Sequence, residues 1–341
     1  MNDFFNLIRR YLLEYLPAQR RLSENTIKSY RHGLNLFISY LRDVMQIPIN
    51  RIAFTDCKRD VVLGYLDWLC AERGCSDTTI NQRLMVLRSF LKFAGETDCT
   101  YAAFGLDAAS VPTRKVSGRV VEFLSEQALK ALLAQPDSRK RTEHRNQFFM
   151  ILMYDTAARC GELLDLKLRD LRIDDKNPVA YLHGKGDKTR IVPLLPETVE
   201  HCRQYIKAFH GNPPHEKTEH VFYTTRYDKR TQMSADTVAL FMKKYCATAI
   251  EECSDMPERL HPHMLRHTRA MHLYRQGMPL HLLSELLGHA NYETTKIYAY
   301  ADSEMKRLAV AKADVLRDGM PPPEPLWTDD EEIILKLSGL R

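Results

Sequence analysis

Apolar residues recur three and four positions apart along much of the chain, which is the pattern of amphipathic helices. Residues 3–95 predict four such helices. One begins after Ser23-Glu24 and another after Ser76-Asp77, both typical helix start signals. The apolar stripes of these two helices are Ile27, Tyr30, Leu34, Phe37, Ile38 and Leu41 in the first and Ile80, Leu84, Leu87 and Leu91 in the second.

The remaining faces of these two helices carry basic side chains. An ordinary solvated surface is the usual explanation of such a face, but two in the same basic domain strengthen the alternative of contact with a polyanion. The side chains that we expect to make this contact are Lys28, Arg31, Arg83, Arg88 and Lys92.

The helical pattern fails between Gly95 and Val121, where Gly105, Pro112 and Gly118 interrupt the chain. We therefore predict a four-helix domain at residues 1–100 and a linker at 101–121. A second domain follows at 122–320 and a tail at 321–341.

The second domain is predicted to be mainly helical with a small antiparallel sheet. Leu171–Asp174 and Val179–His183 resemble strands, and the turn Gly184–Lys188 leads into Arg190–Pro193, which predicts a hairpin with a lysine-bearing tip. The expected helices cover residues 125–135, 145–169, 195–209, 234–252, 263–276, 279–287 and 292–310. After Pro321–Pro323, acidic and then apolar residues predict a last segment that needs a surface to pack against.

Composition and length narrow the class of protein. A chain of 341 residues suits two domains, and 44% hydrophobic with 27% charged residues is typical of folded proteins. The longest apolar run, Phe148–Tyr154, is far shorter than the ~20 residues of a membrane-spanning helix. No signal-peptide pattern begins the sequence, so we expect a cytoplasmic protein of bacterial type. The eight cysteines include no CxxC pair, so we expect reduced thiols.

The net charge of +5 is concentrated at one end of the chain. Residues 1–95 hold 14 Lys and Arg against 9 Asp and Glu, and this difference accounts for the whole excess. The first domain is therefore the more basic part, which agrees with a polyanion partner.

Separated sites in the second domain carry candidate chemistry. Arg159 lies between two apolar helical segments, Lys185 on the hairpin tip, and His263 and Arg266 in a helix that begins at Pro262. His289 follows Gly288, and Tyr298 comes nine positions later. A phosphodiester repels nucleophiles through its negative oxygens, so attack needs fixed cations, and two guanidiniums can each donate paired hydrogen bonds.

The spacing of these residues also suits proton transfer. His263 and Arg266 are three apart, so one helix face can direct both at a single phosphate. A tyrosine hydroxyl has a pKa of ~10, so attack near neutral pH needs a base or a strongly positive pocket, and His263 is a candidate base. The oxygen that leaves the phosphorus must take up a proton, for which Lys185 on the hairpin tip is the natural acid.

In this order, the residues resemble the tyrosine recombinase (integrase) family, whose pattern runs Arg, Lys, His-x-x-Arg, His or Trp, then Tyr. The similarity covers residues 3–310, because Leu22–Arg31 and Arg83–Ala94 also resemble the core-binding helices of its Xer branch. It implies a SAM-like core-binding domain, a catalytic domain of the DNA breaking-rejoining fold, and a C-shaped clamp around duplex DNA. The implied catalytic set is Arg159, Lys185, His263, Arg266 and His289, with Tyr298 as nucleophile.

Several assignments have competitors. Lys188 shares the turn with Lys185, and Tyr292 and Tyr300 flank Tyr298, but the family pattern favours the residues named above. Glu162 follows Arg159 by three and suits a supporting acid. Ala157-Ala158 precede Arg159 where the family more often has Gly and a larger apolar residue.

A zinc site is the main alternative interpretation of the histidines, because His263 and His267 have i, i+4 spacing. No Glu follows His263 as in HExxH and no third ligand has matching spacing, so we expect no metal site. Attack by a tyrosine conserves the energy of the phosphodiester, so we also expect no cofactor.

The resemblance further implies four protomers on paired inverted core sites, exchanging strands through a Holliday junction, with a monomer or weak oligomer in the absence of DNA. Part of residues 303–341 is expected to dock on a neighbouring subunit. We expect integration, excision or transposition of a mobile element, with chromosome or plasmid dimer resolution as the alternative. A type IB topoisomerase and a catalytically silent DNA-binding relative are the rival functions.

Overall fold

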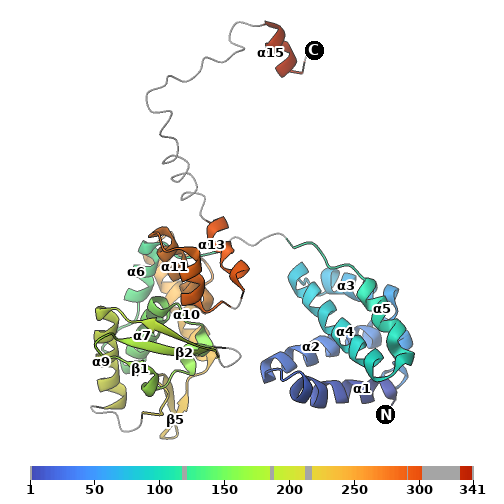
Figure 1. Ribbon diagram of the computed structural model, residues 1–341, viewed down its shortest axis with the longest axis horizontal. Coiled ribbons are helices and arrows are strands. Elements are labelled where there is room, and N and C mark those ends of the chain that lie inside the picture. The colour runs from blue at the N-terminus through green and yellow to red at the C-terminus, as the bar shows by residue number, and fades with distance from the viewer. Residues whose placement is uncertain are drawn as a thin grey trace. The chain divides into compact units, whose positions relative to one another are not determined.

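The structure is a computed structural model that describes residues 2–116, 121–184, 188–211, 217–289, 291–301 and 331–339. The chain divides into two compact units, Met1–Arg119 and Val120–Arg341 (Figure 1). Each unit has its own hydrophobic core. The expected fold class, mainly helical with a small antiparallel sheet, is confirmed.

The first unit consists of helices. Its longer helices are α1 (Asp3–Arg10), which continues as a π-helix (Tyr11–Gln19), α2 (Glu24–Asp43), α3 (Arg59–Ala71), α4 (Asp77–Thr97) and α5 (Ala102–Ser110). Short 3-10 turns occupy Ile49–Arg51, Phe54–Cys57 and Cys99–Tyr101. Both expected start signals are N-caps, and the Ser76 hydroxyl accepts a hydrogen bond from the Thr79 N–H. The Leu and Phe residues of the two expected stripes are buried.

Helix α5 was not predicted, since the segment 101–121 was expected to be a linker. It packs closely on α4 at two glycines: a Cβ on Gly95 would lie 2.9 Å from the Cα of Ala102, and one on Gly105 would lie 3.3 Å from the Leu91 carbonyl oxygen. The guanidinium of Arg88 donates to the carbonyls of Ala108, Ala109 and Val111 at the end of α5. The glycines that interrupt the apolar pattern therefore mark close packing.

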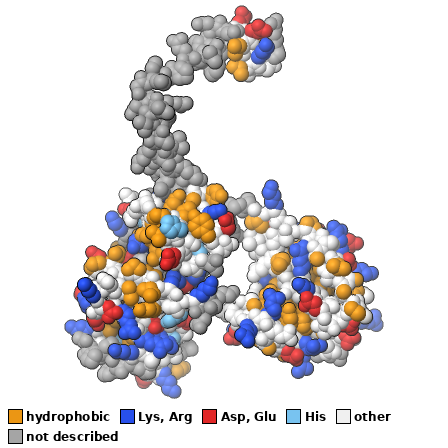
Figure 2. Space-filling view, in the orientation of Figure 1, with side chains coloured by type: hydrophobic (Ala, Val, Ile, Leu, Met, Phe, Trp, Pro, Cys, Tyr) orange, Lys and Arg blue, Asp and Glu red, His pale blue; other side chains and the backbone are white. Residues whose placement is uncertain are grey.

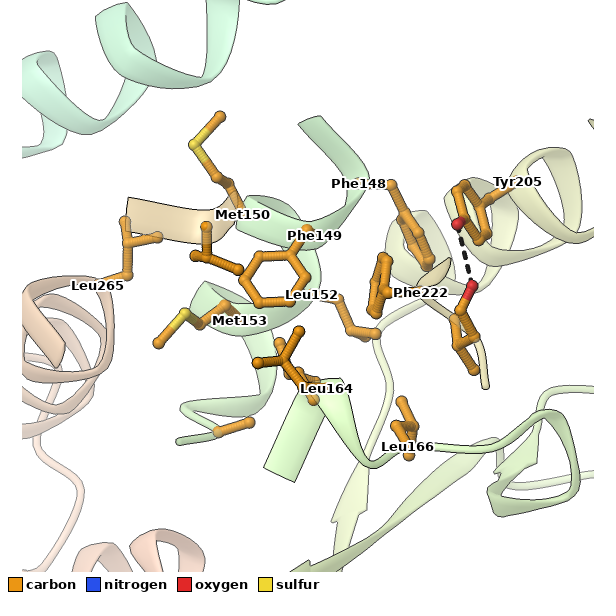
Figure 3. Close-up of a cluster of buried hydrophobic side chains, with 14 of the residues drawn as sticks. Phe148, Phe149, Met150, Leu152, Met153, Leu164, Leu166, Tyr205, Phe222 and Leu265 are labelled. Atoms are coloured by element: carbon orange, nitrogen blue, oxygen red, sulfur yellow. Dashed lines mark hydrogen bonds between the residues drawn. The ribbon is translucent and has the colours of Figure 1, made fainter. Parts of the chain in front are cut away.

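The second unit is built around helix α7 (Arg141–Thr156), whose Phe148, Phe149, Leu152 and Met153 are buried in its core (Figure 3). Further helices that contribute residues to the same core include α6 (Glu126–Ala134), α9 (Pro196–His210), α10 (Ala235–Glu252) and α11 (Pro262–Arg275). Tyr205 of α9 stacks on Phe148 and donates a hydrogen bond to the Val221 carbonyl.

The expected hairpin is present. Strands β1 (Leu171–Arg172), β2 (Val179–Gly184) and β3 (Lys188–Pro193) form an antiparallel sheet in the order β1-β2-β3, with Gly184 opposite Lys188. A second hairpin, β4 (Tyr223–Arg226) with β5 (Lys229–Gln232), was not predicted.

The expected helix at 145–169 is interrupted, because α7 ends at Thr156 and α8 (Cys160–Leu164) begins after a three-residue break. A 3-10 turn, Leu168–Asp170, follows. The chain continues through α12 (Leu280–Leu287), the 3-10 turn Tyr292–Thr294 and α13 (Lys296–Ala301). The rest of the expected 292–310 helix lies outside the described residues, whereas α15 (Glu331–Leu337) confirms a helical segment near the end of the chain.

Candidate active site

The break between α7 and α8 sets the position of Arg159. Ala157 ends α7 with φ 49°, a left-handed conformation, and Arg159 is extended at the start of α8. Glycine adopts positive φ without strain, so the Gly that the family pattern leads one to expect at this position would suit the same turn. Ala157 adopts the same region here, so the departure from the family pattern leaves the turn in place.

The Arg159 side chain is held by two partners. Its Nη1 donates to Glu162 Oε1 at 2.7 Å, and its Nη2 donates to the Gly288 carbonyl at 3.1 Å. About a third of the side chain stays exposed (35%), so the guanidinium is fixed but reachable from solvent.

Arg266 approaches the same place from α11 and is almost fully buried. Its Nη1 donates to the Ala157 carbonyl at 2.7 Å and its Nη2 to the Leu287 carbonyl at 2.6 Å. Burial, together with Arg159 and Arg190, lowers the pKa of Arg266 to about 10. Both arginines therefore use carbonyls at the C-terminus of α12, where a helix leaves such groups unpaired and carries partial negative charge.

Glu162 lies beneath Arg159 and is buried. Its carboxylate accepts two hydrogen bonds from Arg190 of β3, both 2.7 Å, as well as the guanidinium and backbone N–H of Arg159. Burial alone would raise the pKa of Glu162, but these hydrogen bonds and the two guanidiniums lower it to about 2. The carboxylate is thus ionised and saturated with donors.

Tyr298 is fully buried (0% exposed), in a small cluster with Ala157, Ala270, Leu283 and Leu287 among others. Its hydroxyl lies 2.9 Å from His267 Nδ1. Burial raises the pKa of Tyr298 to about 12, an effect that Arg266 opposes. Burial and the nearby charges of His263 and Arg266 lower the pKa of His267 to about 4, and in the tautomer that is protonated on Nε2 its Nδ1 accepts a hydrogen bond from the phenol.

His263 and His289 approach this region from two other elements. His263 lies near the start of α11 with one side open to solvent, and the partial burial of its ring, followed by the charge of Arg266, lowers its pKa. Gly288 ends α12 in the left-handed region (φ 61°), and a hydrogen bond of 2.8 Å joins Nδ1 of the following His289 and Thr295 Oγ1. Burial, followed by Arg266 and Arg159, lowers the pKa of His289 to about 4.

Lys185 lies outside the described residues. Gly184, which precedes it, lies against the site, since a Cβ there would be 3.2 Å from Glu162 Oε1 and 3.8 Å from Arg159 Nη1. The competing Lys188 is exposed in β3.

A surface groove of about 420 Å³ runs past these side chains and is lined by Arg159, Cys160, Gly161, Glu162, Asp165, His183, Gly184 and His263. Tyr298 is not among its lining residues. A larger cavity of about 690 Å³ lies between β1 and α9 and is lined by none of the six predicted catalytic residues. Of these two cavities, only the groove is lined by predicted catalytic residues, Arg159 and His263.

The predicted DNA-contact residues lie on α2 and α4, which cross closely at Gly33 and Val86. Lys28, Arg31 and Lys92 are exposed, and Lys28 and Lys92 each pair with a Glu four residues away. Arg83 is half-buried, and Arg88 is occupied at the end of α5. Figure 2 shows Lys and Arg side chains interspersed with acidic ones on the visible face of each unit.

The sequence did not reveal two parts of this arrangement. His267 was weighed only as a zinc ligand, although it contacts the nucleophile candidate, and Arg190 was not singled out. Its place in β3, two residues before the buried Val192 on the same side of the strand, was the available signal. Among the described residues, no group of three His, Cys, Asp or Glu side chains could hold a metal ion. In the same part of the chain, no helix has the length and apolar character needed to cross a bilayer.

The chain resembles known proteins along most of its length. It is 27% identical over 306 residues to a putative integrase/recombinase, y4rC, of Sinorhizobium fredii, covering 90% of each chain. It is 28% identical over 302 residues to the tyrosine recombinase XerD of Staphylococcus epidermidis, covering 89% of this chain and 96% of the relative.

Two solved structures share its fold. The XerH site-specific recombinase in its post-cleavage complex with palindromic difH substrate matches with a TM-score of 0.64 at 20% identity, covering 86% of this chain and 82% of that one. The Tn1549 transposon integrase in complex with transposon right end DNA matches with a TM-score of 0.67 at 16% identity, covering 92% and 99%.

Two family profiles match the two units in turn. The phage integrase N-terminal SAM-like domain matches residues 8–97, and the phage integrase family matches residues 122–305, more than half of the chain. The chain therefore belongs to the phage integrase family, the tyrosine-type site-specific DNA recombinases.

Proposed function

We propose that Tyr298 of this recombinase attacks a DNA phosphodiester that Arg159 and Arg266 hold. The observation that best supports this is the anchoring of both guanidiniums on carbonyls at the end of α12, beside the cluster that contains Tyr298. Cations fixed before the substrate arrives stabilise the charge that develops on the phosphate oxygens without further reorganisation.

The proposed reaction balances without an external energy source. The Tyr298 oxygen forms a bond to phosphorus, and the bond to the DNA 5′ oxygen breaks, which leaves a 3′-phosphotyrosine and a free 5′ hydroxyl. The phenol proton passes to a histidine, either His263 or His267, and Lys185 gives a proton to the leaving oxygen. Attack by a 5′ hydroxyl of the partner strand reverses these steps, so neither ATP nor a metal ion is consumed.

In this proposal Tyr298 moves before it reacts. Its hydroxyl is fully buried and hydrogen-bonded to His267, whereas the groove holds Arg159 and His263. A phosphate in the groove reaches the phenol only when α13, which carries Tyr298, shifts, or when the side chains that bury Tyr298 move aside. The described arrangement is therefore the resting form.

The proposed partner is duplex DNA with paired inverted core sites, held by both units as a clamp, in the nucleoid of a bacterial cell. The exposed Lys28, Arg31 and Lys92 are the proposed contacts of the first unit, whereas Arg83 and Arg88 have less freedom to reach a backbone. The relatives named in complexes with DNA support this partner. Four protomers would act together, exchanging strands through a Holliday junction.

The proposed biological role is integration, excision or transposition of a mobile element. The putative integrase relative and the transposon integrase fold support it. Dimer resolution by the same chemistry is the alternative, which the XerD relative supports.

The test uses a nicked suicide substrate made from the DNA that flanks the gene, resolved on a denaturing gel without metal or ATP. Wild type and the control Tyr300→Phe are expected to form a covalent band, and Tyr298→Phe is expected to form none. A band from Tyr298→Phe would assign the nucleophile to another residue. Binding by all three proteins with no band from any would favour the silent DNA-binding relative.

We also propose that the tail, residues 321–341, docks on a neighbouring protomer. The amphipathic character of α15, with Glu331 and Glu332 before Ile333 and the exposed Leu337, supports a binding role. Deletion of residues 321–341 should weaken tetramer formation on DNA, measured by native gel or light scattering, and leave single-site binding unchanged. Unchanged assembly and recombination would exclude this docking.

A further inference from the structure

Arg190 occupies an unusual place for an arginine on a short hairpin strand. Only 11% of its side chain is exposed, and its Nη1 and Nη2 donate to the two oxygens of Glu162, each at 2.7 Å. Its Nε is buried without a partner among the described residues. A charge this deeply buried is costly unless its partner compensates it closely, so the pair is a fixed element of the site.

Glu162 connects Arg190 to Arg159. The same carboxylate accepts Nη1 of Arg159 at 2.7 Å and its backbone N–H at 2.8 Å. Three guanidiniums, Arg159, Arg190 and Arg266, influence one another and this single carboxylate electrostatically. Three guanidiniums against one carboxylate leave the cluster with a net positive charge, and Arg190 offsets the charge of Glu162, which would otherwise fall on Arg159 and Arg266 alone.

Arg190 also supports the turn that presents His289. Its Cδ would lie 3.1 Å from a Cβ on Gly288, so the arginine stem packs directly against that glycine. The carbonyl of Gly288 in turn accepts Nη2 of Arg159 at 3.1 Å. One side chain thus contacts both supports of Arg159, the carboxylate and the end of α12.

We propose that Arg190 is a positioning residue for phosphodiester cleavage: it neutralises Glu162, so that the charge and free donors of Arg159 remain available to the scissile phosphate. Without Arg190, the ionised Glu162 competes with the phosphate for Arg159. This inference rests on the proposed function and adds a residue to its machinery. In this proposal Arg190, whose side chain is only 11% exposed, acts through Glu162 and Arg159 rather than by contact with the DNA.

The experiment measures covalent-complex formation in single turnovers on the suicide substrate, with protein in excess, and DNA affinity separately by fluorescence anisotropy. Arg190→Met is expected to slow cleavage at saturation by ~100-fold or more, the scale for loss of one fixed charge contact to a reacting oxyanion, with DNA affinity changed less than about threefold. Arg190→Lys, which keeps the charge but loses the paired hydrogen bonds, should fall between Arg190→Met and wild type. Arg203→Met is the matched control, because Arg203 pairs with Asp174 at the surface of α9, and its rate should equal that of wild type.

The double variant Glu162→Gln with Arg190→Met separates positioning from simple support of the fold. If Glu162 binds the Arg159 guanidinium more tightly once Arg190 no longer shares the carboxylate, removal of the carboxylate charge weakens that hold, and the double variant should cleave ~10-fold faster than Arg190→Met alone. Equal or slower cleavage by the double variant, or a wild-type rate for Arg190→Met, would overturn the proposal.

Protein quality and the underlying function are controlled separately. Thermal unfolding of each variant identifies a rate loss that comes from a damaged fold. If Arg190→Met is unstable, the cleavage rate of Arg190→Lys is compared with that of wild type instead. Wild-type protein that binds the substrate and forms no covalent complex would refute the proposed function, which is a different outcome from a wild-type reaction that Arg190→Met leaves intact.

Discussion

The imidazoles of His267 and His289 have pKa values well below that of an ordinary histidine. Burial and the neighbouring charges lower the pKa of each to about 4 in the folded protein. In an unfolded chain a histidine has a pKa of ~6.5, so between these two values the unfolded state binds protons that the folded state does not. The free energy of unfolding must therefore fall as the pH drops through this window and is fully retained above it.

Substitution of either histidine should reduce this acid sensitivity. Each group contributes at most ~1.4 kcal/mol per pH unit between about pH 6.5 and pH 4. His267→Asn and His289→Asn should each lose less stability than wild type between pH 7 and pH 5, measured by guanidinium chloride unfolding. His201→Asn on the exposed side of α9 should lose as much as wild type. Equal losses in all four proteins would show that these rings do not control the transition.

At this scale the sequence predicted residue types better than contacts. The order Arg159, His263, Arg266, His289, Tyr298 was readable because each lies in a short local motif. The hydrogen bond between Tyr298 and His267 joins residues 31 positions apart, and that from Arg190 to Glu162 joins residues 28 apart. Such pairs depend on how α11, α13 and β3 pack, which no local spacing encodes.

Among the elements, the close contact of α4 with α5 depends on glycines, which have no side chain. A Cβ on Gly95 would lie 2.9 Å from the backbone Cα of Ala102, closer than such atoms pack. The helices can approach this closely only because position 95 carries no side chain. The same contact brings the end of α5 within reach of Arg88.

Gly95→Ala should therefore destabilise the first unit by ~1–3 kcal/mol, the scale for overpacking, although alanine has the better helix propensity by ~1 kcal/mol. Gly161→Ala in α8 is the control, since its Cβ would meet nothing within 4 Å. It should be neutral or slightly stabilising. Calorimetric unfolding of both variants gives the comparison, and a stabilised Gly95→Ala would contradict the close approach.

The sequence predicted the helices and strands in which apolar residues recur with a clear period, and it did not predict those without such a period. Helix α5 is rich in alanine and includes Gly105, so its sequence has no apolar stripe. Strand β5 is exposed along its whole length, and the tip of its hairpin is Tyr227-Asp228, two residues at positive φ without a glycine. The pairing of β4 with β5 thus has no alternation or turn signal in the sequence.

The whole molecule consists of two units with independent cores, Met1–Arg119 and Val120–Arg341. Most buried apolar residues of each unit belong to its own cluster, so each fragment should fold alone. If both units grip one duplex, the covalent link makes the second binding event intramolecular. The full chain should then bind DNA ~100-fold or more tightly than either fragment.

The dependence of binding on salt tests this arrangement more strictly than affinity alone. Each phosphate contact releases counterions, so the slope of log affinity against log salt counts the contacts. For a clamp, the slope of the full chain should be close to the sum of the slopes of the two fragments, measured by anisotropy on one core-site duplex. Lys28→Met, which removes an exposed cation of α2, should lower the slope of fragment 1–119 and of the full chain by about one unit at most. If fragment 120–341 alone reproduced both the affinity and the slope of the full chain, the first unit would have no part in holding the DNA, and its basic surface would be an ordinary solvated one.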